Sequence, residues 1–357
     1  MAPRSAPEYA DGPVAALRRI AFLLERTRAE TYKVKAFRAA AATILPLDPD
    51  DVAMRVREGT LRELPGIGAS TAEVIADAVQ GRVPGRLARL EEEAGGVLVD
   101  GGDGIRAALR GDLHSHSDWS DGGSPIEEMA FTAMELGHEY LVLTDHSPRL
   151  KVANGLSVGR LRRQLDVVDA VNEHLAPAPG GPGFSLLKGI EVDILDDGSL
   201  DQTDEMLAAL DVRVASVHSK LAMDRDAMTR RMLAAVANPF TNVLGHCTGR
   251  LVTGGRGIRA QSQFDARRVF EACAEHDVAV EINARPERRD PPTKLLQLAI
   301  DIGCLFSIDS DAHAPGQLDF QVYGCARAEE LGLDPDRIVN TWRVERLVSW
   351  ARVGVGG

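Results

Sequence analysis

The sequence contains short motifs in which histidines stand together with carboxylates. They read HSHSDWSDG, TDHS, GIEVDIL, SVHSK, GHCTGR and SDAH, in that order along the 357 residues. Imidazole and carboxylate groups without thiolates are ligands suited to zinc, manganese or iron. A pocket with several carboxylates also needs positive charge to avoid repulsion, and bound divalent cations supply it. The motifs therefore favour a metal centre over a purely structural cluster. Their histidines and acids are His114, His116, His146, His218, His246, His313, Asp121, Asp145, Glu191 and Asp311.

Each of these histidines stands at or just past the carboxyl end of a predicted strand. Short apolar strands alternate with helical stretches over roughly 200 residues, which predicts an α/β fold, a TIM-like barrel of seven or eight parallel strands. In such a barrel the carboxyl ends of all strands open onto one face, so the six imidazoles converge. The strands are expected at 109–114, 140–145, 185–192, 212–218, 241–246, 278–283 and 304–309, and helices between them at 125–137, 158–175, 224–237 and 265–276.

The remaining histidines and the cysteines favour structural roles. Three histidines end predicted helices, where a cation meets the negative helix terminus. The cysteines are widely spaced and form no C-x-x-C pair, which favours buried thiols in a reducing compartment over disulfides. No apolar run reaches the roughly 18 residues that span a bilayer, and no signal peptide is evident, so we expect a cytoplasmic protein without membrane contact. These residues are His138, His174, His276, Cys247, Cys273, Cys304 and Cys325.

Charge is distributed unevenly along the chain. Residues 1–90 carry 14 Lys and Arg against 11 Asp and Glu, a net charge of +3, whereas the remainder carries a net charge of −15. A mildly basic head can approach a polyanion, and an acidic body can collect cations. The Gly-rich stretch AGGVLVDGGDG separates the two. We therefore expect a helical head at 1–93, a linker at 94–108 and the barrel at 109–357, with a tight surface turn at 177–183.

The head contains a sequence typical of a helix-hairpin-helix. LPGIGASTAEVI places Gly66, Ile67 and Gly68 in a tight turn before a predicted helix at 69–80. Such a turn brings backbone N–H groups close to a DNA phosphate at the start of a helix. The alternative is a turn that only joins two helices. An upstream basic segment favours DNA contact, and its cationic residues are Lys33, Lys35 and Arg38.

In this order the barrel motifs resemble the metal-binding motifs of the polymerase and histidinol phosphatase (PHP) family. The resemblance covers residues 110–345 and is greatest to the PHP domain that ends bacterial family X DNA polymerases. It implies a distorted (β/α)7 barrel with three divalent ions of zinc, manganese or iron. A first ion would bind His114, His116, Glu191 and Asp311. A second would share Glu191 and add His218 and His246. A third would bind Asp121, His146 and His313.

The resemblance also implies a reaction, the hydrolysis of phosphate esters by metal-bound hydroxide without a covalent intermediate. Clustered metals neutralise the phosphate, orient it and lower the pKa of a bound water. Asp145 and Asn283 are the candidate catalytic residues beside the ligands: Asp145 would orient the neighbouring ligand, and Asn283 would hydrogen-bond a substrate oxygen or cap a turn.

Arginines just beyond the strand ends are the candidate substrate contacts. Arg250 and Arg285 stand where a substrate phosphate would lie, and the alternative is that they pair with surface acids. Four further arginines would line a nucleic-acid track or belong to solvated loops. They are Arg256, Arg259, Arg288 and Arg289.

Residues 14–90 resemble the amino-terminal DNA-end-binding domain of family X polymerases. Ala69 and Ser70 stand where those domains usually carry a lysine after the hairpin. Val74 replaces the lysine of deoxyribose-phosphate lyase chemistry, so we expect no lyase activity. No polymerase palm with an Asp-x-Asp site lies between head and barrel, so we expect no DNA synthesis.

Three functions are consistent with these residues. The leading hypothesis is a metal-dependent DNA 3′–5′ exonuclease or 3′-end-processing nuclease of DNA repair, whose head holds single-stranded DNA or a 3′ end. The alternative is a small-molecule phosphatase of the histidinol phosphatase type. A non-catalytic DNA-binding or scaffolding protein is disfavoured because the ligand set is complete.

Overall fold

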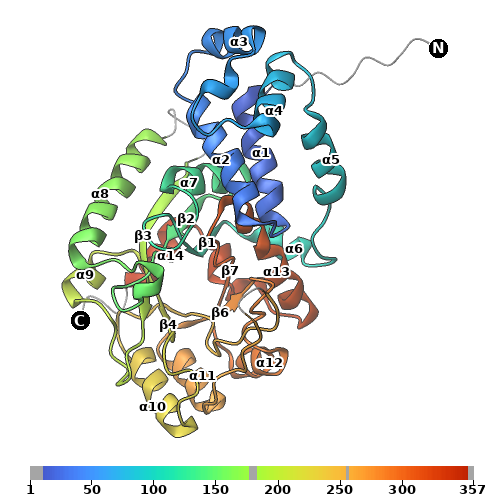
Figure 1. Cartoon of the computed structure of the whole chain (residues 1–357). Helices are drawn as coiled ribbons and strands as arrows, with labels where there is room; N and C mark the ends of the chain where they lie inside the picture. The colour runs from blue at the N-terminus through green and yellow to red at the C-terminus, as the bar shows by residue number, and fades with distance from the viewer. Residues whose placement is uncertain (1–10, 177–182, 255–256, 353–357) are drawn as a thin grey trace. The chain divides into compact units, whose positions relative to one another are not determined.

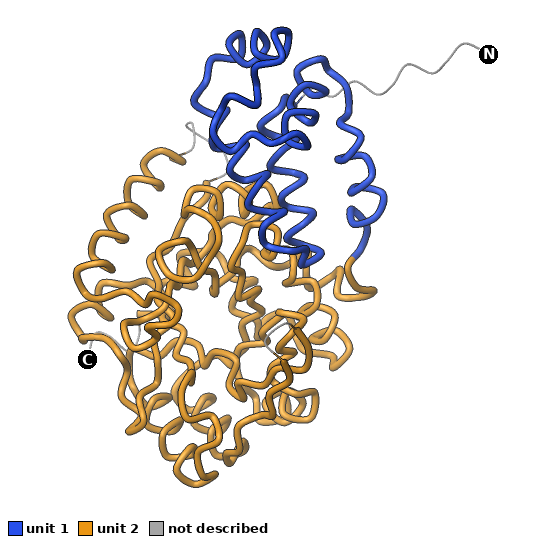
Figure 2. Tube along the Cα trace, in the orientation of Figure 1, with its two compact units in different colours: residues 1–97 blue, residues 98–357 orange. Residues whose placement is uncertain are grey.

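The computed structural model describes residues 11–176, 183–254 and 257–352. The chain divides into two compact units, residues 1–97 and 98–357 (Figure 2). The division falls inside the predicted linker at 94–108, and the second half of that linker forms the helix α6, Asp103–Ala108. Arg256 and all but the last residue of the predicted turn at 177–183 lie outside the described residues.

The first unit is helical, as predicted. The apolar residues of α1 recur every three or four positions, so Leu17, Ile20 and Leu24 are buried along one side of the helix. α3 begins after Asp48, whose side chain caps it, and ends at the left-handed Gly59. The helices are α1 Gly12–Arg26, α2 Thr31–Ile44, α3 Pro49–Glu58, α4 Ala69–Val79 and α5 Gly85–Ala94, with a 3-10 turn η1 at Leu61–Glu63.

The second unit is a barrel of seven strands in which all neighbouring pairs are parallel, as predicted (Figure 1). The order of strands in the sheet is their order in the chain, so helices cover the outside and all carboxyl ends open at one face. The strands are β1 Gly111–Ser115, β2 Tyr140–Leu143, β3 Ser185–Asp193, β4 Val212–Ser216, β5 Val243–Leu244, β6 Ala279–Asn283 and β7 Phe306–Asp309.

Helices follow the strands at the predicted positions. Four of them begin with side-chain caps, which fix where the chain turns back over the barrel. The caps are Ser157 before α8, Thr203 before α9, Asp224 before α10 and Asp265 before α11. The helices are α7 Ile126–Glu135, α8 Val158–His174, α9 Asp204–Ala208, α10 Arg225–Val236, α11 Ala266–Glu275, α12 Thr293–Ile302, α13 Gln321–Glu330 and α14 Val344–Arg352. Short 3-10 turns are η2 Lys151–Ala153, η3 Pro315–Phe320, η4 Pro335–Arg337 and η5 Val339–Thr341. None of the described helices is both long and apolar enough to cross a membrane.

Side chains close the barrel between its first and last strands. Asn340 Nδ2 donates to the carbonyls of Gly111 in β1 and Ile308 in β7, at 3.2 and 3.1 Å. Gln321 Nε2 donates to the same two carbonyls at 3.1 and 2.8 Å. An extra residue in β1 also shifts its register against β2. The sheet is therefore irregular between β1 and β2, and the two amides link β1 to β7 at the amino end of β1. At the opposite end, where the motifs lie, His116 N donates to the Ala312 carbonyl at 2.8 Å.

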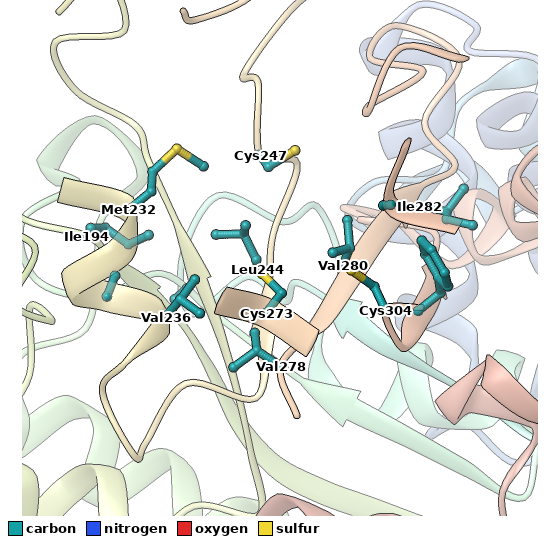
Figure 3. Packing of buried hydrophobic residues seen from close by; sticks show 14 of the residues in the cluster. Ile194, Met232, Val236, Leu244, Cys247, Cys273, Val278, Val280, Ile282 and Cys304 are labelled. Atoms are coloured by element: carbon teal, nitrogen blue, oxygen red, sulfur yellow. The ribbon is translucent and has the colours of Figure 1, made fainter. Parts of the chain in front are cut away.

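The cysteines lie in the apolar core, as predicted. Cys273 and Cys304 pack among Leu244, Val278 and Val280 (Figure 3). All four cysteines are free and buried. Burial raises the pKa of the Cys273 thiol well above its usual range, so this thiol is a packing group and not a nucleophile.

Two of the three helix-end histidines are where the sequence predicts them. His174 ends α8 and His276 caps α11. His138 is different, because it is buried beyond the end of α7 and its Nε2 lies 3.3 Å from Arg106 Nη2. Burial and the Arg106 charge lower the pKa of His138 to about 3, so the ring is neutral at physiological pH. The prediction of a cation at this helix end is therefore wrong.

We expect His138 to make the protein less stable as the pH falls. The ring takes up a proton near pH 6.5 in the unfolded chain but only near pH 3 in the folded chain, so acid favours the unfolded state within this window. Between pH 7 and pH 5 the free energy of unfolding should fall by about 2 kcal/mol more in the wild-type protein than in His138→Gln. Chemical denaturation at both pH values measures the difference, and equal losses in the two proteins would contradict this account.

Candidate metal centre

The barrel motifs meet around one buried carboxylate, that of Glu191 in β3. Its side chain is 1% exposed, and five of the six predicted histidines surround it. From the nearer carboxylate oxygen, the ring nitrogens lie 2.8 Å away in His246, 2.9 Å in His146, 3.1 Å in His218, 3.3 Å in His114 and 3.5 Å in His116. One acid at a strand end is thus the common neighbour of side chains from four other segments.

The sixth histidine lies at the open edge of the same cluster. Asp121 Oδ1 lies 3.3 Å from His313 Nε2 and 3.4 Å from His146 Nε2. Asp311 Oδ1 lies 3.5 Å from His116 Nε2. The Asp121 side chain is 23% exposed, more than any other predicted ligand. All nine predicted ligands are therefore brought together, with Asp121 on the side that faces solvent.

Among the described residues, three groups of side chains are close enough to hold one ion each. They differ in part from the sets that the family resemblance implies, because Glu191 is missing from the first set and His116 joins the third. In the second set, His146 takes the place of His246 beside Glu191. The assignment of each ligand to one ion stays a prediction, whereas the convergence of the ligands is a property of the structure. The groups are His116, Asp121, His146 and His313; His114, His116 and Asp311; and His146, Glu191 and His218.

Several ring nitrogens of the cluster are buried without a hydrogen-bond partner. Nε2 of His114 and Nε2 of His218 face Glu191 without a hydrogen-bonding geometry, and both ring nitrogens of His116 are unpaired. An unpaired buried polar atom costs free energy, and a divalent cation between imidazole and carboxylate would satisfy both groups. The donor set contains no thiol, which suits zinc, manganese or iron. The residues present therefore fit a divalent metal centre.

Two acids outside the predicted ligand set contact imidazoles of the cluster on the ring side that faces away from Glu191. His114 Nδ1 donates to Glu281 Oε1 at 2.6 Å, and His218 Nδ1 donates to Asp193 Oδ1. These bonds fix each ring so that Nε2 points into the cluster. Sequence reasoning missed both acids. The signals were a lone acid inside the buried strand AVEIN for Glu281, and for Asp193 an acid two residues after Glu191 on the same side of β3.

The cluster contains ionised carboxylates and two kinds of imidazole. Burial opposes a charge on His114, His146 and His218, but the carboxylate of Glu191 raises the pKa of all three rings above the usual range. The rings of His116 and His246 are neutral at physiological pH. Burial opposes the charge of Glu191, but the surrounding imidazoles, first among them His218, hold its pKa well below the usual range. Burial and neighbouring imidazoles lower the pKa of His116 to about 3. Burial and a nearby arginine lower the pKa of His246 to about 4. Deprotonated carboxylates and neutral imidazoles are the forms that bind metal ions.

Asp311 is positioned by β6 and by the loop that follows it. Its backbone has a left-handed φ of 51°, which is uncommon for a residue with a side chain. Asn283 Nδ2 and Arg288 Nε donate to Asp311 Oδ2 at 3.1 and 2.9 Å, and Arg285 Nη1 donates to its carbonyl at 3.0 Å. Asn283 is fully buried and also donates to Glu281 Oε2 at 3.3 Å. Asn283 therefore orients two carboxylates. Its Oδ1 also accepts from Arg285 N at 3.2 Å, in agreement with the alternative that it caps a turn, and its contact with a substrate oxygen stays a prediction.

Asp145 lies outside the ligand cluster. Its buried carboxylate accepts hydrogen bonds from Ser117 N at 2.9 Å, Ser117 Oγ at 2.5 Å and Gln164 Nε2 at 2.5 Å, and a further one from Ser120 Oγ. These bonds hold the turn that leads into Asp121. Asp145 therefore supports the ligands through the turn between His116 and Asp121, in agreement with the predicted orienting role, although it acts through a backbone turn and not on the neighbouring ligand itself.

The two arginines predicted to contact substrate lie in different places. Arg285 lines the cavity in front of the cluster, with Nη1 2.8 Å from His313 Nδ1. Arg250 instead donates from Nε to the Arg288 carbonyl at 3.1 Å and from Nη2 to the Arg289 carbonyl. Its guanidinium supports a loop backbone, so the prediction of a phosphate contact by Arg250 is corrected. Arg288, expected on a nucleic-acid track or in a solvated loop, lines the cavity.

The cavity in front of the cluster has a volume of about 610 Å³. Ligands such as Asp121 and His218 form its floor, and Arg259, Arg285 and Arg288 form part of its wall. Convergent polar groups in a concave site of this size are typical of a site for a small molecule or one unit of a polymer. The arginines select for an anion, since guanidinium groups match phosphate and carboxylate oxygens.

The turn of the head has the backbone expected of a helix-hairpin-helix. Gly66 has a left-handed φ of 76°, and Gly68 precedes α4 without a side-chain cap. Ile67 between them is buried and anchors the turn, while Gly68 is exposed. The first amides of a helix lack partners within it and suit an anion. Val74, at the position of the lyase lysine, is buried in the core of the head.

The three predicted cations of the head have different surroundings. Arg38 donates two hydrogen bonds to the buried Glu25, at 2.7 and 3.0 Å, and so ties α2 to α1. Its predicted DNA contact is corrected for this reason. Lys33 pairs with Glu30 at 2.7 Å on the surface, and Lys35 is exposed. The DNA contacts of these two lysines stay predictions.

Family models match both units of the chain. Residues 112–285 match the PHP domain, and residues 11–83 match a helix-hairpin-helix domain. The chain is a PHP-domain protein. Its family places it among the hydrolases of phosphoester bonds, and domains of this family bind divalent metals, in agreement with the clustered ligands.

Relatives of this PHP-domain protein carry two kinds of name. The DNA polymerase/3′-5′ exonuclease PolX of Bacillus subtilis (strain 168) is 37% identical over 232 residues, which are 65% of this chain and 39% of that protein. A protein of Thermoanaerobacter sp. (strain X514) named as a probable phosphatase is 26% identical over 242 residues, 64% of this chain and 89% of that protein. This chain thus spans well under half the length of its polymerase relative.

The PHP-domain protein also matches a solved histidinol phosphate phosphatase of Lactococcus lactis, in complex with zinc, L-histidinol and phosphate. The match covers 63% of this chain and 95% of that chain, at 16% identity and a TM-score of 0.44.

Glu281→Gln should weaken metal binding of the PHP-domain protein by about 10- to 100-fold. The amide removes the negative charge behind His114 and offers an N–H where Glu281 accepts hydrogen bonds. Competition with a fluorescent chelator measures the affinity. Glu275→Gln at the exposed end of α11 is the matched control and should bind metal as the wild-type protein does. Equal affinity in Glu281→Gln would show that this acid does not support the site.

Proposed function

We propose that this chain is a metal-dependent nuclease that removes nucleotides from DNA 3′ ends or processes such ends. The proposal rests on one observation: the same chain contains a unit suited to metal-dependent hydrolysis and a unit suited to binding DNA. The barrel gathers a complete ring of metal-ligating side chains around Glu191, and the head presents an exposed helix-hairpin-helix turn. The name of the PolX relative includes the same 3′-5′ exonuclease reaction, which supports the proposal.

We propose that the nine converging side chains would hold three divalent cations of zinc, manganese or iron, with Glu191 as a shared ligand. The unpaired nitrogens of His114, His116 and His218 support these positions. When bound, such cations neutralise the phosphate, orient it and lower the pKa of an attacking water. His246 stays in the proposed set because its Nε2 lies 2.8 Å from Glu191.

The chain's own side chains would bind and orient the ester. Arg285 and Arg288 hold Asp311 and line the cavity, with side chains 19% and 13% exposed. Each has guanidinium hydrogens in a planar fork that can bind phosphate oxygens. Held beside Asp311, they would place the phosphate against the ligand cluster and not elsewhere in the cavity. Asp121, at the exposed edge, marks the side from which the substrate approaches.

The head would hold the DNA strand, single-stranded or at a 3′ end. The open amides at the start of α4 would bind one phosphate, and Lys33 and Lys35 on α2 would add attraction for the backbone. The net charge of +3 over residues 1–90 favours the same polyanion. Four free buried thiols suit a reducing compartment, and we place the protein in the cytoplasm.

The second candidate function is a small-molecule phosphatase. It is favoured by the relative named as a probable phosphatase, which the match covers over 89% of its length. The barrel alone would supply the chemistry of such an enzyme. The two candidates separate in one comparison, because a phosphatase hydrolyses histidinol phosphate rapidly and leaves oligonucleotides intact, whereas the proposed nuclease releases mononucleotides when metal is added.

His218→Ala should reduce metal-dependent release of mononucleotides by about 100-fold or more, because it removes a ligand that faces Glu191. The barrel should stay folded, since His218 lies past the end of β4 and not in the core. Digestion of a labelled oligonucleotide measures the activity, and circular dichroism checks the fold. His174→Ala at the end of α8 is the control and should retain activity. Full turnover by His218→Ala would refute the metal assignment.

Gly68→Asp should weaken DNA binding by about tenfold because it puts a negative charge where a strand phosphate would lie. The helix should tolerate the change: a Cβ at Gly68 meets nothing within 4 Å, and aspartate is a favoured residue before a helix. Gly85→Asp at the start of α5, where the space is equally open, is the matched control. Fluorescence anisotropy with labelled DNA measures binding.

Hydrolysis of bis(p-nitrophenyl) phosphate should be the same in wild-type protein, Gly68→Asp and Gly85→Asp, because this small diester needs the barrel alone. If Gly68→Asp binds DNA as tightly as Gly85→Asp does, the hairpin is a structural turn and does not touch the strand.

A further inference from the structure

A second cavity lies beside the one that contains the metal ligands. Its volume is about 840 Å³, against about 610 Å³ for the metal cavity. Thr253 belongs to the walls of both, so the two cavities are neighbours. The proposed reaction at the metal centre leaves this larger cavity without a role.

One loop supplies arginines to both cavities. Arg285 and Arg288 line the metal cavity, whereas Arg289 lines the second one. The alternation depends on the path of the backbone, which is left-handed at Arg289 with a φ of 48°. Arg250 holds this path by donating to the carbonyls of Arg288 and Arg289. The loop after β6 therefore presents cations in two directions from one fixed backbone.

Arg327 on α13 provides the second cation of the larger cavity. Its Nη2 donates to the carbonyl of Pro291, while its Nη1 is buried without a hydrogen-bond partner. Burial, with the nearby charges of Arg250 and Arg289, lowers the pKa of Arg327 to about 10, so the guanidinium stays charged at neutral pH. A buried charged donor without an acceptor is costly, and an anionic oxygen in the cavity would satisfy it.

The other residues of the wall indicate which further groups a ligand of this cavity would have. Tyr323 and Val252 offer apolar surface beside the two arginines. Acids line the cavity too, but Asp100 and Glu330 are exposed, and Glu329 accepts a hydrogen bond from Gly102 N at 2.7 Å. A ligand with an anionic group and a flat apolar group matches this wall, because guanidinium binds phosphate and a tyrosine ring stacks on a base.

We propose that this second cavity is a nucleotide subsite. It holds the nucleotide next to the phosphate at the metal centre, with its phosphate on Arg289 and Arg327 and its base against Tyr323. The inference deepens the proposed nuclease function and rests on it. A strand would cross from one cavity to the other at Thr253, over the loop that carries arginines to both sides.

Strand binding without metal tests the subsite directly. The full chain in EDTA is titrated with fluorescein-labelled hexathymidylate at several KCl concentrations. Arg327→Gln and Arg289→Gln should each weaken binding and reduce the slope of log Kd against log [KCl] by about 0.7, the value expected when the protein neutralises one phosphate fewer on a single strand. Arg267→Gln, on the exposed face of α11 and in neither cavity, is the matched control and should keep the wild-type slope.

Arg327→Gln could unfold the protein, because Arg327 donates a hydrogen bond to the Pro291 carbonyl. Arg289→Gln keeps the test valid in that case, because the Arg289 side chain is exposed and its loss should leave the fold intact. Thermal melting identifies which variants are folded. Unchanged slopes in folded variants would overturn the subsite.

Turnover provides the second test. With metal added, both variants should lower kcat/KM for the 5′-phosphorylated thymidine dinucleotide pTpT, which has a second phosphate for the subsite, by about tenfold. Hydrolysis of thymidine 5′-(p-nitrophenyl phosphate), which has one nucleotide and one phosphate, should be unchanged. Equal losses on both substrates would overturn the subsite, because they would place the arginines at the reacting phosphate.

Free nucleotide is the competing source of the same chemistry. Calorimetric titration with thymidine monophosphate compares it with the strand. If the variants lose affinity for the mononucleotide and keep it for hexathymidylate, the cavity does not hold the strand and the proposal fails. A wild-type protein that binds hexathymidylate but never cleaves it would count against the nuclease function alone, because the salt slopes need no cleavage.

Discussion

The structure depends on a single buried carboxylate among imidazoles. Glu191 has five histidines within 3.5 Å of its oxygens, and these come from four segments that are far apart in the sequence. Without a charge partner, a carboxylate that is 1% exposed would be strongly disfavoured in its ionised form. The strands must therefore end together on one face. Between the first and last strands, the backbone bond from His116 N to the Ala312 carbonyl, at 2.8 Å, holds the two motifs together at that face. The amides of Asn340 and Gln321 link the same two strands at the amino end of β1.

A layer of acids lies beneath the histidines. Glu281 faces His114, and Asp112 and Asp309 are buried next to it, each bonded to backbone amides of the other's strand or turn. Burial and the Asp309 charge raise the pKa of Asp112 well above its usual range, and burial and the Glu281 charge raise the pKa of Asp309 to about 6. The layer is therefore held short of full ionisation. Its remaining negative charge favours cations in the layer above.

The sequence predicted the residues whose position follows from strand geometry. The seven parallel strands and the nine converging ligands were all expected, because a motif at the end of a parallel strand has only one face to occupy. The differences from the structure concern residues whose direction depends on a loop path or on burial. Asp145 and Glu191 both stand near strand ends, yet the Asp145 carboxylate accepts hydrogen bonds from a backbone turn and does not enter the cluster. Similarly, Arg250 and Arg288 differ only in which carbonyl or carboxylate the loop brings within reach.

The features that the sequence did not reveal also depend on burial. His138 reads as a helix-end cation, but Arg106 and the core make it neutral, and neither neighbour is visible from local spacing. Glu281 reads as an isolated acid in an apolar strand, and its partner His114 comes from 167 residues away. Such pairs are fixed by tertiary packing. A carboxylate in the middle of a buried strand is nevertheless a usable signal, since it needs a partner to stay ionised.

Reaction and substrate choice are carried by different parts of this molecule. In the proposed reaction the ligand cluster would act on the phosphate and the attacking water alone, and such a cluster suits a phosphatase as well as a nuclease. Selection between those substrates must come from groups that contact the rest of the ester. The groups that we propose for this selection are the loop after β6, the wall at Thr253 and the hairpin at Gly68. The loop is the link between the two tasks, because the same backbone that turns Arg288 toward Asp311 turns Arg289 away from it.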